Sequence, residues 1–134
     1  MQFAPSSASE YLQQCTHELA RIVLSQIDRL VDDIYEAYLK QRFVFIIGNG
    51  GSASTASHFC EDLGKGTIPS GQRADSKRIR AISLTDNAPY LLAWGNDEGF
   101  ECVFEEQLKN LASSGDCLIA ISCSGNCPNI LRFP

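Results

Sequence analysis

A continuous apolar run that ends in a glycine-rich turn constrains the fold of this chain more than any other stretch. Residues 43–47 are all apolar, Gly48-Asn49-Gly50-Gly51-Ser52 follows at once, and mostly small residues and helix formers then extend to Leu63. Unbroken apolarity over so few residues is typical of a parallel strand that is buried on both faces. The pattern predicts a buried strand, a tight loop and a helix that opens on the loop.

The glycine-rich loop has two interpretations that weigh about equally on this stretch alone. The first is a phosphate site, because such a loop points backbone N–H groups and a helix N-terminus at one spot. The second is a plain turn between a strand and a helix. The loop lacks the lysine of the Walker motif, and its spacing is not that of the dinucleotide fingerprint, so we expect no nucleotide cofactor.

A second loop has a residue pattern similar to that of the first. The apolar run 117–122 leads into Ser122-Cys123-Ser124-Gly125-Asn126-Cys127-Pro128, with small hydroxyl residues, a Gly-Asn pair and a proline suited to a first helical turn. Ligands in open α/β sheets bind at the carboxyl ends of the strands, and serine hydroxyls can donate to phosphate oxygens. Two such loops together predict a shared phosphate site.

The rest of the chain alternates helices and strands, which predicts a doubly wound α/β fold. A loose terminus is expected at 1–6, and a capping box at Ser7 and Glu10 then opens a helical stretch that runs past Lys40, with a break near 25–28. The other expected elements are a polar loop at 67–77, a strand at 78–85, a short helix at 89–94, a loop at 95–99, and a helix at 100–112 with Val103, Phe104, Leu108 and Leu111 on its inner side.

The amino-terminal helical stretch is long for one globular helix, and its first half has few neighbours in sequence to pack against. We therefore expect its apolar face to meet another copy of the protein. The alternative, that it only covers the sheet, stays open. This gives an N-terminal helical oligomerisation segment at 1–41 and a ligand-binding domain at 42–134.

Composition narrows the classes of function. The chain has 134 residues and a net charge of −5, and its 11 Lys and Arg residues are scattered, so we expect no nucleic-acid partner. We expect neither a signal peptide nor a membrane-spanning segment, because the sequence shows no apolar run of sufficient length. Its six cysteines form no Cys-x-x-Cys pair, which predicts reduced thiols in a cytoplasmic protein.

Six motifs in order carry a family resemblance. They are Gly48-Asn49-Gly50-Gly51-Ser52, His58-Phe59-x-Glu61-Asp62-Leu63, Ala81-Ile82-Ser83-Leu84-Thr85, Gly95-Asn96-Asp97-x-Gly99-Phe100-Glu101, Gly115-Asp116, and Ile121-Ser122-x-Ser124-Gly125-Asn126. With these motifs the chain resembles the sugar isomerase (SIS) domain family, and most closely the phosphoheptose isomerases. The resemblance extends from about residue 10 to the end.

The resemblance implies a flavodoxin-like parallel sheet, a homotetramer or dimer assembled through amino-terminal helices, and a sedoheptulose 7-phosphate substrate that is converted to a heptose 7-phosphate. By motif position it implies a sugar site at Asn49, Gly50, Gly51, Ser52, Asn96 and Asp97. It places the phosphate at Ser122, Cys123 and Ser124.

The same resemblance implies that His58 binds zinc and that Asp62 occupies the place of a glutamate that binds zinc and acts as the catalytic base. An aldose–ketose interconversion needs such groups, because a carboxylate can move the proton and a metal can stabilise the enediolate. From spacing alone, His58 and Asp62 share a helix face, and a solvated face is the commoner meaning of such a pair.

Three departures lead us to expect impaired or absent isomerase activity. Asp62 is one methylene shorter than glutamate, and Cys123 and Cys127 replace hydroxyl residues with weaker donors. Family members also continue beyond the point where Pro134 ends this chain, with a glutamine and a histidine that bind zinc. We therefore expect a truncated gene product or a fragment, or a sheet that another copy completes. A non-catalytic regulatory or scaffolding role and a degraded gene product are the alternatives.

Overall fold

The computed structural model of the chain describes residues 7–71 and 76–133. The chain divides into two compact units, Met1–Asp32 and Asp33–Pro134, and each is described by itself. The loose terminus expected at 1–6 and the middle of the polar loop expected at 67–77 lie outside the described residues. Among the residues that are described, no helix combines the length and the apolar character needed to cross a membrane.

The first unit contains helix α1 (Ala8–Ala20) and the start of α2 (Leu24–Lys40). The Ser7 hydroxyl accepts a hydrogen bond from the Glu10 amide at 3.2 Å, as the predicted capping box requires. The helical stretch breaks at residues 21–23, before the predicted 25–28. The break contains Ile22 and Val23, whose β-branched side chains favour extended backbone, whereas Ser25 is accommodated in the first turn of α2.

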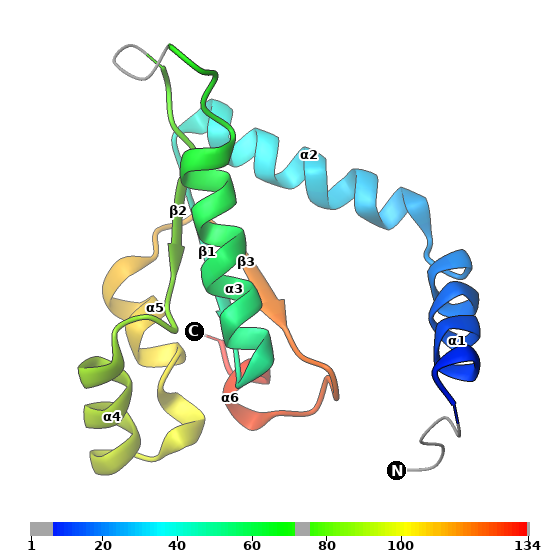
Figure 1. Ribbon diagram of the computed structural model, residues 1–134. Coiled ribbons are helices and arrows are strands. Elements are labelled where there is room, and N and C mark those ends of the chain that lie inside the picture. Colours follow the sequence, from blue (N-terminus) through cyan, green and yellow to red (C-terminus); the bar gives the residue numbers. More distant parts are fainter. Residues whose placement is uncertain (1–6, 72–75, 134) are drawn as a thin grey trace. The chain divides into compact units, whose positions relative to one another are not determined.

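The second unit is built on a three-stranded parallel sheet with the order β2-β1-β3 (Figure 1). Phe45 on the central strand lies opposite Ile82 on one neighbour and Leu118 on the other. The elements after α2 are β1 (Phe43–Gly48), α3 (Gly51–Glu61), the π-helical turn η1 (Asp62–Gly66), β2 (Arg80–Ser83), α4 (Ala88–Asp97), the 3-10 turn η2 (Phe100–Cys102), α5 (Glu105–Leu111), β3 (Cys117–Ile121) and α6 (Pro128–Leu131).

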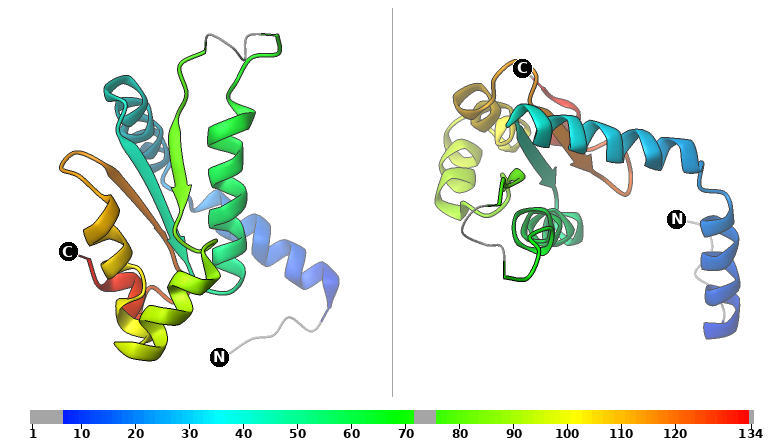
Figure 2. Two further views of the ribbon diagram at one scale, coloured as in Figure 1. Left: turned by 90° about the vertical axis from the view of Figure 1, so that its left-hand side faces the viewer. Right: turned by 90° about the horizontal axis from the view of Figure 1, so that it is seen from above.

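Helices cover both faces of this sheet, so the unit has three layers (Figure 2). Alternate residues of β1 point to opposite faces. Phe45 and Ile47 pack with Val103 and with residues of α4, α5 and α6, whereas Val44 and Ile46 pack against the other side, with α3 and the end of α2. These layers confirm the predicted α/β class. The two apolar cores, one on each face of the sheet, stabilise the pairing in which the carboxyl ends of β1 and β3 lie next to each other.

Two expectations about the segment after β2 are wrong. Helix α4 continues through the predicted loop at 95–99 as far as Asp97, because Gly95 fits inside the helix and Glu98 N still bonds Trp94 O at 3.0 Å. The turn comes at Gly99, which has φ +104°. The expected helix at 100–112 is divided into η2 and α5, and Leu111 is 44% exposed rather than on the inner side.

Candidate functional site

The loop after β1 is shaped by two glycines. A Cβ on Gly48 would lie 2.6 Å from the carbonyl oxygen of Ser52, so only glycine lets the chain turn so tightly from strand to helix. Gly50 has φ +54° and precedes the first residue of α3. The Ser52 amide donates to Asn49 O at 3.0 Å, which closes the turn. Helix α3 therefore begins inside the glycine-rich loop, three residues before the expected Ser54.

The loop after β3 is held in its conformation by hydrogen bonds from its backbone amides to its own serine hydroxyls. The Gly125 amide donates to Ser122 Oγ at 3.1 Å, and the Asn126 amide donates to Ser124 Oγ at 3.2 Å. Gly125 has φ +66°, a conformation that glycine adopts without strain. Both serine oxygens accept from the backbone, so the hydroxyl hydrogens of Ser122 and Ser124 are left to donate elsewhere.

The two loops meet in space although Ser52 and Cys123, which lie next to each other, are 71 positions apart in the sequence. Asn49 Nδ2 donates to Asn129 Oδ1, and Asn129 Nδ2 donates to Asn49 Oδ1, both at 2.9 Å. Ser52 Oγ lies 3.9 Å from Cys123 Sγ. Asn129 is only 2% exposed, so the reciprocal amide pair is shielded from water on that side. We call the two joined loops, residues 49–52 and 122–127, the cradle.

Cys127 lies at the end of the cradle, half-buried, with its sulfur among hydroxyl groups. Ser124 Oγ is 3.5 Å from Cys127 Sγ, and Ser122 Oγ is 3.8 Å from it. Hydrogen bonds from Ser124, Ser122 and Asn49 lower the pKa of the Cys127 thiol below its usual value, against the opposing effect of burial. The thiol is therefore a hydrogen-bonded member of the cradle.

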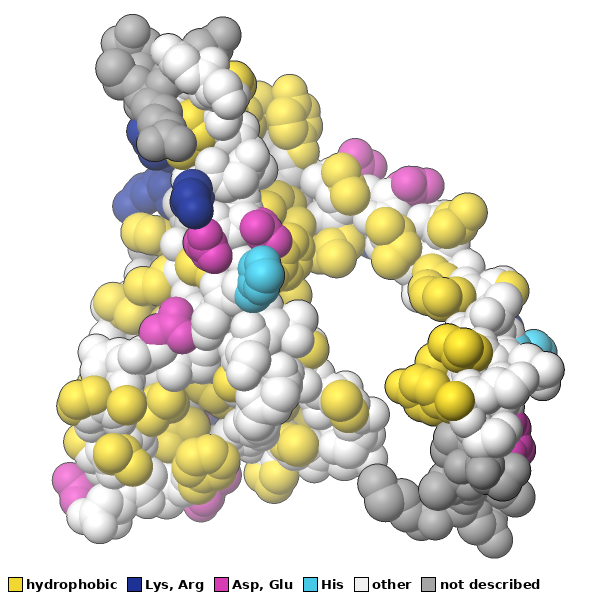
Figure 3. All heavy atoms as spheres, viewed as in Figure 1, with side chains coloured by type: hydrophobic (Ala, Val, Ile, Leu, Met, Phe, Trp, Pro, Cys, Tyr) yellow, Lys and Arg dark blue, Asp and Glu magenta, His cyan; other side chains and the backbone are white. Residues whose placement is uncertain are grey.

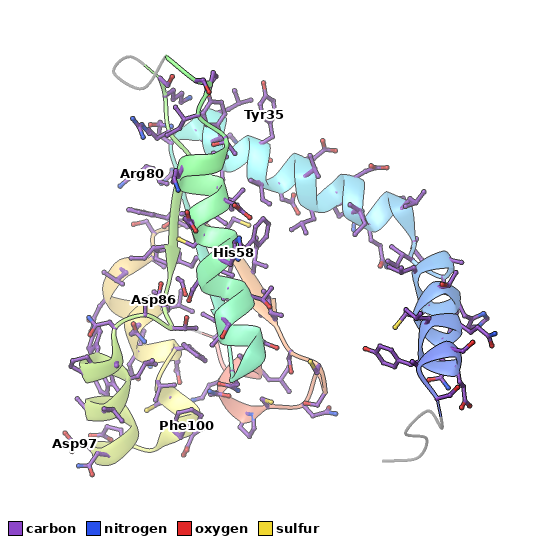
Figure 4. The ribbon with its side chains drawn as sticks, in the orientation of Figure 1. Tyr35, His58, Arg80, Asp86, Asp97 and Phe100 are labelled. Carbon is purple, nitrogen blue, oxygen red and sulfur yellow. The ribbon has the colours of Figure 1, made fainter. Side chains whose placement is uncertain are left out.

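The predicted metal residues lie on the outer face of α3 and its continuation. His58 Nε2 is 3.5 Å from Asp62 Oδ2, and the two side chains are 73% and 66% exposed. Figure 3 shows the histidine and acidic side chains together on the surface over α3, and Figure 4 shows His58 in the middle of that helix. Two ligands at about 2.1 Å from a tetrahedral zinc lie about 3.4 Å apart, so the spacing fits two corners of a zinc site.

This pair supplies two ligands, one or two fewer than the protein residues of most zinc sites provide. Within residues 7–71 and 76–133, no group of three or more His, Cys, Asp and Glu side chains could hold a metal. His58 and Asp62 therefore fit two positions of a zinc site, and the described residues bring no third ligand beside them.

The backbone changes its helical period at Asp62. The stretch 62–66 is a π-helical turn, in which the Thr67 amide bonds Asp62 O at 3.2 Å, instead of the expected helix end at 64–66. Such turns occur often at functional sites. The neighbouring Glu61 bonds Lys65 at 3.0 Å, and this lowers the pKa of the Glu61 carboxyl. Glu61 is thus paired with Lys65, and Asp62 is the carboxylate that faces His58.

Asn96 and Asp97 are not brought to the cradle within one chain. They lie exposed in the last turn of α4, where Asn96 Nδ2 donates to Asp97 Oδ1 at 2.7 Å. Figure 4 shows Asp97 at the far end of α4 and well apart from His58. Their predicted part in sugar binding stays a prediction.

Two features of the site region escaped sequence reasoning. One is Asn129, whose partner Asn49 is too distant in sequence for any local pattern to indicate the pair. The other is a hydroxyl cluster in which Ser57 on α3 bonds Asp86 and contacts Thr85, just beyond β2. The only available signal was a serine on the inner side of α3 where apolar residues are usual. The cluster ties α3, the helix of His58, to the end of β2.

Comparison with known proteins identifies the family to which this chain belongs. The SIS domain profile matches residues 9–133. A lincomycin biosynthesis protein from Streptomyces lincolnensis is 36% identical, over 90% of this chain and 49% of that protein. A phosphoheptose isomerase from Campylobacter jejuni is 38% identical, over 86% of this chain and 59% of the relative. This chain spans about half the length of the curated relatives it matches.

Solved structures agree with the sequence relatives. A phosphoheptose isomerase from Francisella tularensis superposes with a TM-score of 0.80 at 27% identity, covering 92% of this chain and 63% of that one. The enzyme from Neisseria gonorrhoeae gives 0.65 at 29% identity, covering 93% and 66%. The fold is thus shared with phosphoheptose isomerases, and the chain belongs to the SIS domain family.

Proposed function

We propose that the chain binds a phosphorylated sugar of the sedoheptulose 7-phosphate class in the cradle. The observation that carries the proposal is the meeting of the two loops, which the Asn49–Asn129 amide pair holds in place. Phosphate oxygens would accept from the hydroxyls of Ser52, Ser122 and Ser124 and from amides around Gly50 and Gly51. Cys123 would line the same site and donate more weakly.

We infer further that the complete site isomerises this sugar phosphate between ketose and aldose, towards a heptose 7-phosphate. Asp62 would take the proton from the carbon next to the carbonyl and return it to the neighbouring carbon. Its exposed carboxylate is free of the lysine that holds Glu61, which leaves it available as a base. Because aspartate reaches less far than glutamate, we propose that the rate is reduced.

Zinc is part of this proposal. His58 and Asp62 would hold it, and the metal would supply stabilisation of negative charge on the substrate oxygens. The additional ligands, and Asn96 and Asp97 as sugar contacts, would come into place in an assembly or with residues outside those described.

We propose that the assembly is a homo-oligomer, a tetramer or dimer, formed through the amino-terminal helices in the cytoplasm. In the first unit, α1 buries none of its residues, and large apolar side chains stand exposed along it and the start of α2: Tyr11, Leu12, Leu19, Leu24, Ile27 and Val31. A surface of this kind is typical of an interface. Sedimentation of the wild-type chain beside Leu19→Asp tests it, since a monomeric wild type would refute the oligomer.

Calorimetric titration tests the binding proposal directly. Sedoheptulose 7-phosphate should bind, whereas unphosphorylated sedoheptulose should not, because the cradle recognises phosphate. Ser124→Ala should weaken binding by about tenfold, the effect of one charge-assisted hydrogen bond. Ser114→Ala, in the turn before β3, is the matched control and should change nothing. No heat of binding at millimolar sugar phosphate would refute the proposal.

A binding-only regulatory role is the second candidate. It is favoured by the open arrangement of His58 and Asp62, which are both more than 60% exposed and share no third ligand among the described residues. Zinc analysis of the purified oligomer together with an isomerisation assay separates the two candidates. Bound zinc and turnover support the enzyme, and sugar-phosphate binding without either supports the regulatory role.

A further inference from the structure

Glu105 is the one charged residue that is buried among residues 7–71 and 76–133. It is 8% exposed and begins helix α5, which covers the face of the sheet on which Phe45 lies. Burying a carboxylate is costly unless cations and hydrogen-bond donors compensate for the water that it has lost. The partners of Glu105 therefore matter more to the fold than those of the exposed carboxylates.

Two cations reach Glu105, and they come from different elements. Lys109 Nζ lies 2.8 Å from Glu105 Oε1, one turn further along α5. Arg132 Nε pairs with the other oxygen, Oε2, from the residue that caps the end of α6. The hydrogen bond from Lys109, followed by the charge of Arg132, lowers the pKa of the Glu105 carboxyl against the opposing effect of burial. Lys109 thus binds Glu105 within one helix, whereas Arg132 joins two helices.

Oε2 of Glu105 depends on Arg132. Within the described part of the chain this oxygen accepts no hydrogen bond of normal geometry, so the ion pair is what compensates for its burial. Removing one partner of a buried ion pair leaves the other charge uncompensated, which is strongly unfavourable. The structure therefore favours the position of α6 in which Arg132 meets Glu105.

Helix α6 needs such a contact because it is short. It spans only Pro128–Leu131, and so short a helix is not stable by itself. Ile130 packs in the core with α5, and Asn129 forms the amide pair with Asn49 in the cradle. Arg132 follows Asn129 by three positions, so the ion pair and the amide pair hold the two ends of about one helical turn. Figure 2 shows α6 next to α5.

We propose that Glu105 is a positioning residue for the cradle. Through Arg132 it holds α6 in the place where Asn129 reaches Asn49, and in this way it sets the affinity of the cradle for the sugar phosphate. No hydrogen bond or ion pair among the described residues joins Glu105 to the cradle directly, so its effect is transmitted by α6. The effect on affinity rests on the proposed function, whereas the link from Glu105 to the amide pair does not.

Two single variants separate positioning from a general loss of stability. Arg132→Ala removes the cation that joins Glu105 to α6 and should weaken sedoheptulose 7-phosphate binding by about fivefold, within the range for residues of one network. Lys109→Ala is the matched control, because it removes the other cation on the same carboxylate but no contact of α6, and it should keep the wild-type affinity.

The conservative variant Arg132→Lys retains the charge and should recover most of the affinity. Arg132→Gln takes the place of Arg132→Ala if that chain does not fold. Equal losses of affinity in Arg132→Ala and Lys109→Ala would show that Glu105 acts only through stability, and this would overturn the proposal. So would wild-type affinity in Arg132→Ala.

A double-mutant cycle tests the route. In a chain that already carries Asn129→Ala, Arg132→Ala should change the affinity by less than about twofold, because the amide pair through which it acts is gone. The same fivefold loss in that background would mean that Arg132 acts independently of Asn129, and the proposal would fail.

Amide hydrogen exchange supplies a measurement that needs no ligand. Arg132→Ala should speed the exchange of the Ile130 and Leu131 amides, which bond the carbonyl before α6, by about fivefold, whereas Lys109→Ala should not. Unchanged exchange in Arg132→Ala overturns the link between Glu105 and α6. If exchange responds as expected but the wild type never binds the sugar phosphate, the proposed function fails and the link to the amide pair stands.

Discussion

Most of the proposed binding and catalytic residues lie in two places, the cradle and the outer face of α3. The two places differ in the contacts that fix the side chains. In the cradle, backbone turns, serine hydroxyls and the buried Asn129 fix one another. On α3 and its continuation, His58 and Asp62 pair with each other at 3.5 Å and are both largely exposed. The cradle is thus held by several hydrogen bonds within one chain, whereas His58 and Asp62 form an exposed pair on the surface of a helix.

The difference separates binding from catalysis. A phosphate group can be recognised by donors that one chain arranges in advance, which reduces the cost of ordering on binding. Proton transfer needs a base placed to within a fraction of an ångström, and an exposed side chain does not provide this by itself. Substitutions that open the turn before the cradle or remove its amide pair should therefore change stability and binding together, whereas substitutions of His58 and Asp62 should change chemistry with little effect on stability.

The largest effect is expected at Gly48. In Gly48→Ala the new methyl group would lie 2.6 Å from the Ser52 carbonyl oxygen, and the turn into α3 would have to open. The free energy of unfolding should fall by about 3 kcal/mol, and sugar-phosphate binding should be lost. Urea unfolding measures the first and calorimetry the second.

Gly51→Ala is the matched control, because a methyl group there meets nothing within 4 Å. Its stability should be unchanged or slightly raised, since alanine favours helix. If Gly48→Ala unfolds at the same urea concentration as wild type, the tight turn is not what shapes the cradle.

The next effect is expected at Asn129, which is 2% exposed. Asn129→Ala removes both hydrogen bonds to Asn49 and leaves that amide without its partner. The free energy of unfolding should fall by about 2 kcal/mol, with weaker sugar-phosphate binding. Asn126→Ala, an exposed amide in the same loop, should cost less than about 1 kcal/mol in urea unfolding. Equal effects of the two variants would contradict a specific role for the amide pair.

A smaller effect on α3 concerns rate rather than stability. Asp62→Glu restores the longer carboxylate, so the rate of sedoheptulose 7-phosphate isomerisation should rise by about tenfold. Urea unfolding should not change. Glu61→Gln is the control, since Lys65 already holds Glu61, and should leave the rate as it is. A slower Asp62→Glu chain would show that the position is not that of the base.

The smallest effect on folding is expected at His58. His58→Ala should change the free energy of unfolding by less than about 0.5 kcal/mol, because the side chain is 73% exposed. Equilibrium dialysis against zinc should nevertheless show a lost site. Unchanged zinc uptake would remove His58 from the metal proposal, and a large loss of stability would contradict the independence of the α3 face.

Sequence reasoning reached the parts of this molecule that local patterns control. The apolar runs at 43–47 and 117–121 predicted parallel strands, and the glycines and serines that follow predicted two loops at one edge. The i, i+4 spacing of His58 and Asp62 predicted that they share one helix face, and the two side chains lie 3.5 Å apart. Each of these depends on residues within a few positions of one another.

What sequence reasoning missed depends on distant contacts or on competing local signals. The Asn129–Asn49 pair forms only once the fold is complete. The sequence predicts that this helix ends at Trp94, because residues 95–99 are rich in side chains that turn and hydrogen-bond. In the structure the turn comes at Gly99, with its positive φ, so Asn96 and Asp97 lie in a helix rather than in a loop. The break after α1 followed Ile22 and Val23 rather than the capping residues near 25–28.

The central claim, that both loops form one phosphate cradle, is tested most directly by a nuclear magnetic resonance titration with sedoheptulose 7-phosphate. The amide signals of Gly50, Ser52, Ser124 and Gly125 should shift together along a single saturation curve, since one ligand would contact both loops. Shifts confined to one loop, or two curves with different midpoints, would contradict it.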